Sequence, residues 1–153
     1  ITEWDLQDDH YHLRTSFPAQ RLAMYGADLC NAMLAEHDLT LAQWVILSAL
    51  WREDGLLVSD IARYSGNNVP AASRLIGRME KHGLVTRHID PQDRRTVRVH
   101  LTKKSSKLEP LLDFYKDVNA NLLAGFTAKE KTKLSKMLER IAENANSSVA
   151  AKE

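Results

Sequence analysis

Two adjacent arginines, Arg94 and Arg95, occupy the most unusual stretch of the chain, DPQDRRTVRVHLT at residues 90–102. The Asp-Pro pair favours a turn, and the residues after the arginines alternate between apolar and polar, as in a half-buried strand. The arginines therefore fall near the tip of a β-hairpin, where they bury nothing. A guanidinium group placed there can bind phosphate, and Asp93 is close enough to pair with one arginine and orient it. The alternative is a solvated turn with a surface ion pair, which stabilises little.

A second group of cations lies just upstream, in VPAASRLIGRMEKHG at residues 69–83. The spacing predicts a helix with Asn68 available as its cap, a proline in its first turn and Gly83 at its end. The face predicted to pack inward holds Val69, Ala72, Leu75, Ile76 and Met79. The opposite face holds Pro70, Arg74, Gly77, Arg78 and Lys81, with Ser73 beside the helix start.

These two groups share a chemistry that suits a nucleic acid. Arginine forks can bond guanine edges in a major groove, and hydroxyl, amide and helix-terminal N–H groups can hold phosphates. A hairpin tip is thin enough to reach a minor groove, whose negative potential attracts arginine. The alternative for the helix is an ordinary amphipathic segment with a solvated basic face. The candidate DNA-binding residues are Asn68, Pro70, Ser73, Arg74, Arg78, Lys81, Asp93, Arg94 and Arg95.

The elements around these residues form a recognisable order. A short helix at 59–64 is broken by Gly66 and followed by the longer helix at 69–83, which is the helix-turn-helix pattern. The segments LVTRHI and TVRVHL, on either side of DPQDRR, predict two strands joined by a turn. The sequence therefore predicts a mainly α fold with a small β-hairpin wing, a winged helix-turn-helix.

Long amphipathic segments flank this unit on both sides. Thr40 and Gln43 form a capping box before a helix, and Thr127 and Glu130 form a second one. One apolar stripe is predicted to run from 108 to 126, and another follows the second box. We expect an N-terminal arm and dimerisation helix at 1–37, a DNA-binding domain at 38–102, dimerisation helices at 103–147 and a frayed tail at 148–153.

The flanking helices also bear on assembly. A central domain of about 50 residues cannot bury all of their apolar stripes, so a two-fold homodimer is the simplest way to cover them. The alternative is a monomer with a helical cap domain.

Charge and composition narrow the class of protein. The net charge is +1, but residues 58–102 hold eight Lys and Arg against four acids, whereas residues 1–57 hold three arginines against nine acids. A basic centre in a nearly neutral chain indicates a local contact with a polyanion; the alternative is a solvated surface. No apolar run is long enough to span a membrane, and a single cysteine, Cys30, favours a reducing cytoplasm.

An enzyme is not indicated. The segment DDHYH near the N-terminus could in principle bind a metal, but no second ligand cluster of similar density supports it. There is no G-x-S-x-G, H-E-x-x-H or Walker loop. We expect no catalytic residue, no metal and no cofactor.

The run from DIA at residue 60 to the Leu-Thr at 101–102 resembles the MarR family of winged-helix transcriptional regulators, whose wing carries a D-P-x-D-R-R-type sequence leading into Leu-Thr. The segment HDLTLAQWVILSAL also resembles that family's second helix, so the resemblance covers most of the chain. It implies a homodimer whose first and last two helices interlock. It also implies a regulator, often a repressor, that binds double-stranded DNA at a pseudo-palindromic operator. The alternative is a winged-helix protein-interaction module.

Single positions can be matched to the family pattern. Ser73 and Arg74 match its recognition-helix contacts, and Asp93 and Arg95 match its wing positions, with one arginine in the minor groove. The sequence departs from the pattern at 71–72, where two alanines replace hydroxyl or β-branched residues. It also departs at 57–58, where Leu-Val replaces a Ser/Thr cap.

The same resemblance implies an effector, commonly a small aromatic or anionic molecule, at the junction of the dimer helices and the DNA-binding domain. Arg14, Phe17, Trp44 and Trp51 are the predicted lining residues, although each aromatic could equally be part of the core. Some members of the family sense oxidants through a cysteine. Cys30 lies on the apolar side of its helix without a neighbouring cation, so we expect an inert thiol.

Overall fold

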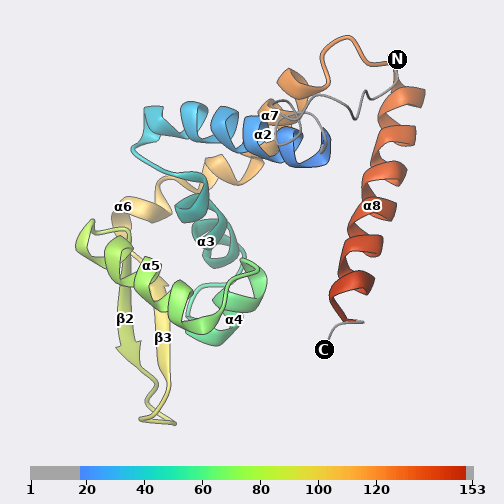
Figure 1. Cartoon of the computed structure of the whole chain (residues 1–153). Coiled ribbons are helices and arrows are strands. Elements are labelled where there is room, and N and C mark those ends of the chain that lie inside the picture. The colour runs from blue at the N-terminus through green and yellow to red at the C-terminus, as the bar shows by residue number, and fades with distance from the viewer. Residues whose placement is uncertain (1–17, 151–153) are drawn as a thin grey trace, which may run out of the picture. The chain divides into compact units, whose positions relative to one another are not determined.

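A computed structural model of the chain describes residues 18–150, which are mainly helical with one small antiparallel sheet (Figure 1). In chain order the elements are α2 (Pro18–Leu34), η1 (Ala35–His37), α3 (Leu41–Arg52), β1 (Leu56–Leu57), α4 (Val58–Tyr64), α5 (Val69–Lys81), β2 (Val85–Ile89), β3 (Val97–Leu101), α6 (Lys103–Ser106), η2 (Glu109–Asp113), α7 (Phe114–Leu122) and α8 (Ala128–Ala150). The predicted fold class is confirmed. Arg14, Phe17 and the DDHYH segment lie outside the described residues.

The chain divides into two compact units, Ile1–Tyr115 and Lys116–Glu153. The core of the first unit is centred on α3, where Ile46, Leu47 and Leu50 are fully buried. Apolar side chains from α4, α5 and the sheet complete the core; those that are fully buried are Ile61, Ile76, Met79, Val85 and Val99. Because all these elements share one core, α5 and the sheet are held in a fixed relation to each other.

The helix-turn-helix consists of α4 and α5, as predicted. Asn68 is the N-cap of α5, and its Oδ1 accepts a hydrogen bond from the backbone amide of Ala71 at 2.9 Å. Gly83, with φ of 69°, supplies the left-handed conformation that ends the helix. The prediction that Val69 packs inward was wrong, because its side chain is 49% exposed in the first helical turn.

The sheet has the strand order β1-β3-β2, and both pairings are antiparallel. The hairpin of β2 and β3 is the predicted wing, with Ile89 opposite Val97 next to the turn. Strand β1 was not predicted, because two leucines, Leu56 and Leu57, are too short a run to give an alternating pattern. It pairs with β3 and attaches the wing to the end of α3.

A junction at Thr102 joins three element ends. Its Oγ1 donates a hydrogen bond to the carbonyl of Gly83 at 2.7 Å, where α5 has just ended. The same oxygen accepts from the backbone amide of Ser105 at 3.2 Å, in a capping box that starts α6. The Trp51 indole N–H donates to the carbonyl of Ser105 at 3.0 Å, which adds α3 to the same junction.

The helices after the wing differ from the expected single stripe. Residues 108–126 are not one helix: a 3-10 segment, Glu109–Asp113, precedes α7, and Phe126 lies beyond the end of α7. Pro110 explains the break, because proline is tolerated only in the first turn of an α-helix. The second capping box, at Thr127, is confirmed; α8 then extends to Ala150, into the segment expected to fray.

Candidate nucleic-acid interface

The outer face of α5 carries a row of cations without internal partners. Arg74, Arg78 and Lys81 are exposed, and the two arginines are one helical turn apart. Within residues 18–150, none of these three side chains has a hydrogen-bond or ion-pair partner. The fully buried residues Ala72, Ile76 and Met79 hold the other face of the helix, so folding does not use the cations.

The smaller predicted contact residues surround the start of this row. Pro70 is exposed in the first turn of α5, and Ser73 is half-buried beside Arg74. The Asn68 side chain is already used as the helix cap, which leaves its Nδ2 as the group that can meet a phosphate. The structure therefore brings the helical candidates together on one end and one face of α5.

A salt bridge connects α5 to the wing. Glu80 on α5 accepts a hydrogen bond from the backbone amide of Arg87 on β2 at 3.1 Å and one from its Nε at 2.9 Å. A third contact joins Arg87 Nη2 to the same carboxylate at 2.8 Å. These bonds from the Arg87 side chain lower the pKa of Glu80, so the carboxylate stays ionised at neutral pH. The arrangement sets the spacing between the helix and the hairpin.

The turn of the wing is held by Asp93, but not in the predicted way. Asp93 Oδ2 accepts a hydrogen bond from the Thr96 hydroxyl at 2.7 Å, and Oδ1 accepts one from the backbone amide of Arg95 at 3.0 Å. Both bonds lower the pKa of Asp93, and the bond from the Thr96 hydroxyl has the larger effect. The expected pairing of Asp93 with an arginine side chain is absent from residues 18–150; each carboxylate oxygen instead accepts a hydrogen bond that closes the turn.

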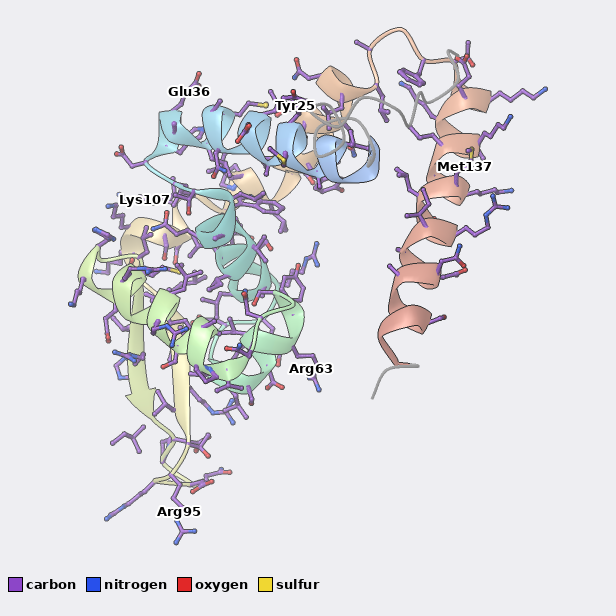
Figure 2. The ribbon with its side chains drawn as sticks, viewed as in Figure 1. Tyr25, Glu36, Arg63, Arg95, Lys107 and Met137 are labelled. Atoms are coloured by element: carbon purple, nitrogen blue, oxygen red, sulfur yellow. The ribbon has the colours of Figure 1, made fainter. Side chains whose placement is uncertain are left out.

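The arginines at the tip are consequently free to bind. Arg94 and Arg95 are both exposed, and their guanidinium groups have no hydrogen-bond or ion-pair partner in the described part of the chain. Figure 2 shows Arg95 at the far end of the wing, directed away from the helices of the first unit. The tip thus presents two positive charges on a backbone that is fixed by its own aspartate.

The strand ends next to the turn of the wing carry a network that sequence reasoning missed. Arg98 on β3 bonds Asp90 through its Nε and donates from Nη1 to the carbonyl of Gly55 at 2.9 Å. Asp90 is nearly buried and also accepts from the backbone amide of Gln92 at 2.8 Å. The hydrogen bond from the Gln92 amide lowers the pKa of Asp90 most, and the bond from Arg98 lowers it further. The network fixes the direction in which the hairpin leaves the body.

The two tryptophans predicted to line an effector site have structural roles. The indole N–H of Trp44 donates to the carbonyl of Leu111 at 2.7 Å, and its ring lies 5.5 Å from that of Phe114, centre to centre. Trp51 bonds the carbonyl of Ser105. Both side chains are half-buried and join α3 to residues 105–114. The indole N–H groups of both tryptophans are therefore already used within the fold.

Cys30, the other candidate for sensing, is a free thiol on α2. Burial raises its pKa, which keeps it protonated at neutral pH and makes it a poor nucleophile. Among residues 18–150, no group of three or more His, Cys, Asp or Glu side chains could hold a metal ion. No helix within that range is long and apolar enough to cross a membrane.

Two features define the class of protein: a helix-turn-helix with an exposed row of cations and an adjoining basic β-hairpin. Together they make a winged helix-turn-helix. Residues 39–97 match the MarR family. An uncharacterized HTH-type transcriptional regulator of Bacillus subtilis (strain 168), YwaE, is 31% identical over 127 residues, which are 82% of this chain and 72% of that protein. The chain therefore belongs to the MarR family and is a transcriptional regulator.

Solved structures show the same fold. The PcaV transcriptional regulator from Streptomyces coelicolor, in complex with its natural ligand, is 27% identical with a TM-score of 0.73, over 95% of this chain and 99% of that one. The S. aureus MepR–DNA complex is 22% identical with a TM-score of 0.76, over 85% of this chain and 96% of that one.

Proposed function

We propose that this protein binds specific sequences in double-stranded DNA, with α5 in the major groove and the wing in the adjacent minor groove. The carrying observation is that the exposed cations of α5 and of the wing tip have no partners within residues 18–150, while Glu80 and Arg87 fix the two elements relative to each other. MepR, which shares the fold, has been crystallised with DNA. Arginine on a base edge gives specificity, and the wing arginines add phosphate or minor-groove contacts.

The assembly that we propose is a homodimer on a pseudo-palindromic operator. Large apolar side chains are exposed on α2 and on α8, and Figure 2 shows Tyr25 and Met137 among them. Exposed apolar area of this kind marks an interface. Light scattering at micromolar concentration should give twice the chain mass of 17.3 kDa. A mass of one chain throughout that range would contradict the dimer.

A gel-shift experiment tests the DNA proposal directly. Fragments of the source genome and random DNA of equal length are compared at several stated salt concentrations, because affinity without the salt concentration has no clear meaning. We expect at least one fragment to bind more tightly than random DNA. Arg140→Ala on α8 serves as a matched control for arginine variants on α5 and the wing. Equal, weak binding to all DNA would favour the alternative, a winged-helix module that binds a protein.

We propose further that the regulator is a repressor released by a small aromatic or anionic effector, with Arg14, Phe17, Trp44 and Trp51 as its site. The support is the family membership and the natural ligand bound to PcaV. The test is to titrate benzoate while following tryptophan fluorescence and operator binding together. Under this proposal the protein acts in the cytoplasm and catalyses no reaction.

A further inference from the structure

Two histidines lie next to each other on the outer face of the sheet. Val99 is fully buried on one face of β3, and its neighbour His100 therefore lies on the other face. His88 on β2 is opposite Arg98, and His100 is opposite Thr86, so the two histidines are diagonal neighbours on adjacent strands. The centres of their rings are 5.4 Å apart, and the ring planes meet at 72°.

The ring of His100 is held in one orientation. Its Nδ1 lies 3.2 Å from Asp54 Oδ2, and it is the donor because an ionised carboxylate can only accept. Asp54 is itself fixed, since its Oδ1 accepts from the backbone amide of Leu101 at 2.8 Å. The ring also lies against Gly55, where an added Cβ would come within 2.8 Å of His100 Cε1. With its proton on Nδ1, the neutral ring keeps a free lone pair on Nε2.

The ring of His88 has a similar arrangement. Its Nε2 lies 3.1 Å from the hydroxyl oxygen of Thr86. When Nε2–H donates to that hydroxyl, the lone pair of the neutral ring is on Nδ1. Neither His88 Nδ1 nor His100 Nε2 has a hydrogen-bond partner in the part of the chain that the structure describes. Two adjacent strands thus each supply one unused imidazole nitrogen, the nitrogen ligand that zinc prefers in proteins.

The spacing of the rings matches a shared metal ion. A zinc–nitrogen bond is about 2.0–2.1 Å long, and the centre of an imidazole lies about 1.2 Å behind its ligating nitrogen, so each ring centre is about 3.2 Å from the ion. At a tetrahedral angle, two such centres are about 5.2 Å apart. The observed separation is 5.4 Å. His88 is exposed, so its ring can turn toward the ion while His100 stays on Asp54.

We propose that the outer face of the wing binds one divalent ion of the zinc type, with His88 Nδ1 and His100 Nε2 as its two protein ligands. Asp54 serves as the carboxylate that commonly orients a ligating histidine from behind. Imidazole suits zinc, copper and nickel, whereas magnesium prefers oxygen. Two protein ligands are fewer than the three of catalytic zinc sites, so water completes the coordination and we expect exchangeable binding in the micromolar range.

The surrounding charges are compatible with a cation. Arg98, which is opposite His88, is already paired with Asp90, and Asp54 adds a negative charge beside His100. The site lies on the face of the sheet opposite to the one from which Arg87 reaches α5. A bound ion would join β2 to β3 and, through Asp54, to the segment that follows α3. It would therefore stabilise the wing, and this expectation does not depend on the proposed DNA binding.

Zinc sulfate and magnesium sulfate are suitable probes, since the two cations have the same charge and differ in their preferred ligands. The imidazole ¹H–¹⁵N NMR signals of the full chain are followed at a slightly alkaline pH, where histidine is neutral. We expect zinc to cause saturable shifts of the His88 and His100 signals and to raise the melting temperature, because it binds the folded chain. Magnesium should do neither. Absence of a saturable zinc shift at these two histidines would overturn the proposal.

Single substitutions make the result specific to this pair. His88→Gln and His100→Gln should each abolish the zinc shift of the remaining partner, whereas His82→Gln, which removes an exposed histidine at the end of α5, should not. Asp54→Asn keeps both ligands and should weaken zinc binding by about 10-fold or more, since it removes the charge behind His100. Melts without metal show whether each variant is folded. Unchanged zinc affinity in folded His88→Gln and His100→Gln would contradict the assignment.

Light scattering distinguishes a site within one chain from an ion shared between molecules. The mass should stay the same when zinc saturates the histidine shifts. A mass that increases in parallel with those shifts would mean that zinc bridges molecules, and it would overturn the proposed site. Because neither measurement uses DNA, a failure of the DNA-binding proposal would leave both results unaffected.

Discussion

The recognition helix and the wing present similar charges but are built in different ways. Helix α5 is held by its buried face, by the Asn68 cap and by Gly83 at its end, and its cations take no part in folding. The wing has little core beyond its base: near its turn, Ile89 is 64% exposed. Its shape depends on hydrogen bonds that the carboxylates of Asp90 and Asp93 accept, and one of its arginines, Arg98, is used internally.

This difference separates binding from folding in a useful way. A cation removed from α5 should alter DNA binding and leave stability unchanged. In the wing, we expect the tip arginines to act in DNA binding, whereas the aspartates and Arg98 hold the shape of the hairpin. A mutant of the wing therefore has to be assigned to one of these two groups before its DNA affinity is interpreted.

The largest effect is expected from Arg74→Ala. Loss of an arginine that bonds a base edge should weaken operator binding by about 1–3 kcal/mol, with little change in the melting temperature. Gel-shifts on operator and random DNA measure the change in affinity, and a thermal melt measures the melting temperature. Equal loss on both DNAs would assign Arg74 to phosphate, and no loss on either would remove it from the interface.

Asn68→Ala tests the helix through its scaffold instead of its charge. Loss of an N-cap costs about 1 kcal/mol of stability, so the melt should shift and operator affinity should fall because the first turn of α5 frays. Asn68→Asp restores a capping oxygen and should recover the stability. If Asn68→Ala changed affinity without changing the melt, Asn68 would act by touching DNA directly.

The wing arginines should give smaller, salt-dependent effects. Arg95→Ala is expected to lose more affinity than Arg94→Ala, and each should reduce the salt dependence of binding by about one unit of slope if it removes a phosphate contact. A side-chain pair between Asp93 and Arg95, as the sequence suggested, would make Arg95→Ala loosen the hairpin. We expect no such loosening, because Asp93 accepts instead from the backbone amide of Arg95, which alanine keeps. Full tolerance of both changes would make the tip a solvated turn.

The turn of the wing should keep its stability at neutral pH and lose it in acid, which is the smallest of the expected effects at neutral pH. The pKa values of Asp90 and Asp93 are lowered in the fold, so their stabilisation is complete above the ordinary aspartate pKa of about 4 and is lost as the pH falls through the lowered values. The amides of Gln92 and Arg95 should then lose hydrogen-exchange protection before that of Ala71, which bonds the non-titrating Asn68. Simultaneous loss of all three would show that the helix and the wing are equally sensitive to acid.

Local rules predicted much of this molecule from its sequence. The capping boxes, Gly83, the alternation of the second strand and the cationic face of α5 each depend on residues a few positions apart. The prediction that Val69 packs inward was wrong because the first turn of α5 projects beyond the core. The prediction of one apolar stripe from 108 to 126 was wrong because apolar spacing was given more weight than Pro110, which ends an α-helix.

The contacts that hold the wing in place could not be predicted by such local rules. Arg98 reaches Gly55 only because β1 pairs with β3, and Glu80 reaches Arg87 only because the chain reverses between α5 and β2. Both contacts depend on tertiary register, which no short spacing encodes. The free arginines at the tip have a local cause instead, since Asp93 is occupied by the Thr96 hydroxyl and by the backbone amide of Arg95.

The Thr102 junction has a mechanical consequence. Its hydroxyl clamps the end of α5 to the start of α6, and Trp51 clamps α3 to the same point. Helices joined only by a loop could rotate relative to each other. These hydrogen bonds instead transmit a small rotation of one helix to the others. The C-terminal end of α5 is thereby linked to the segment after the wing. Because the shared core and the Glu80–Arg87 salt bridge also hold α5 against the sheet, a rotation of that segment turns the row that carries Arg74 and Arg78 together with the wing.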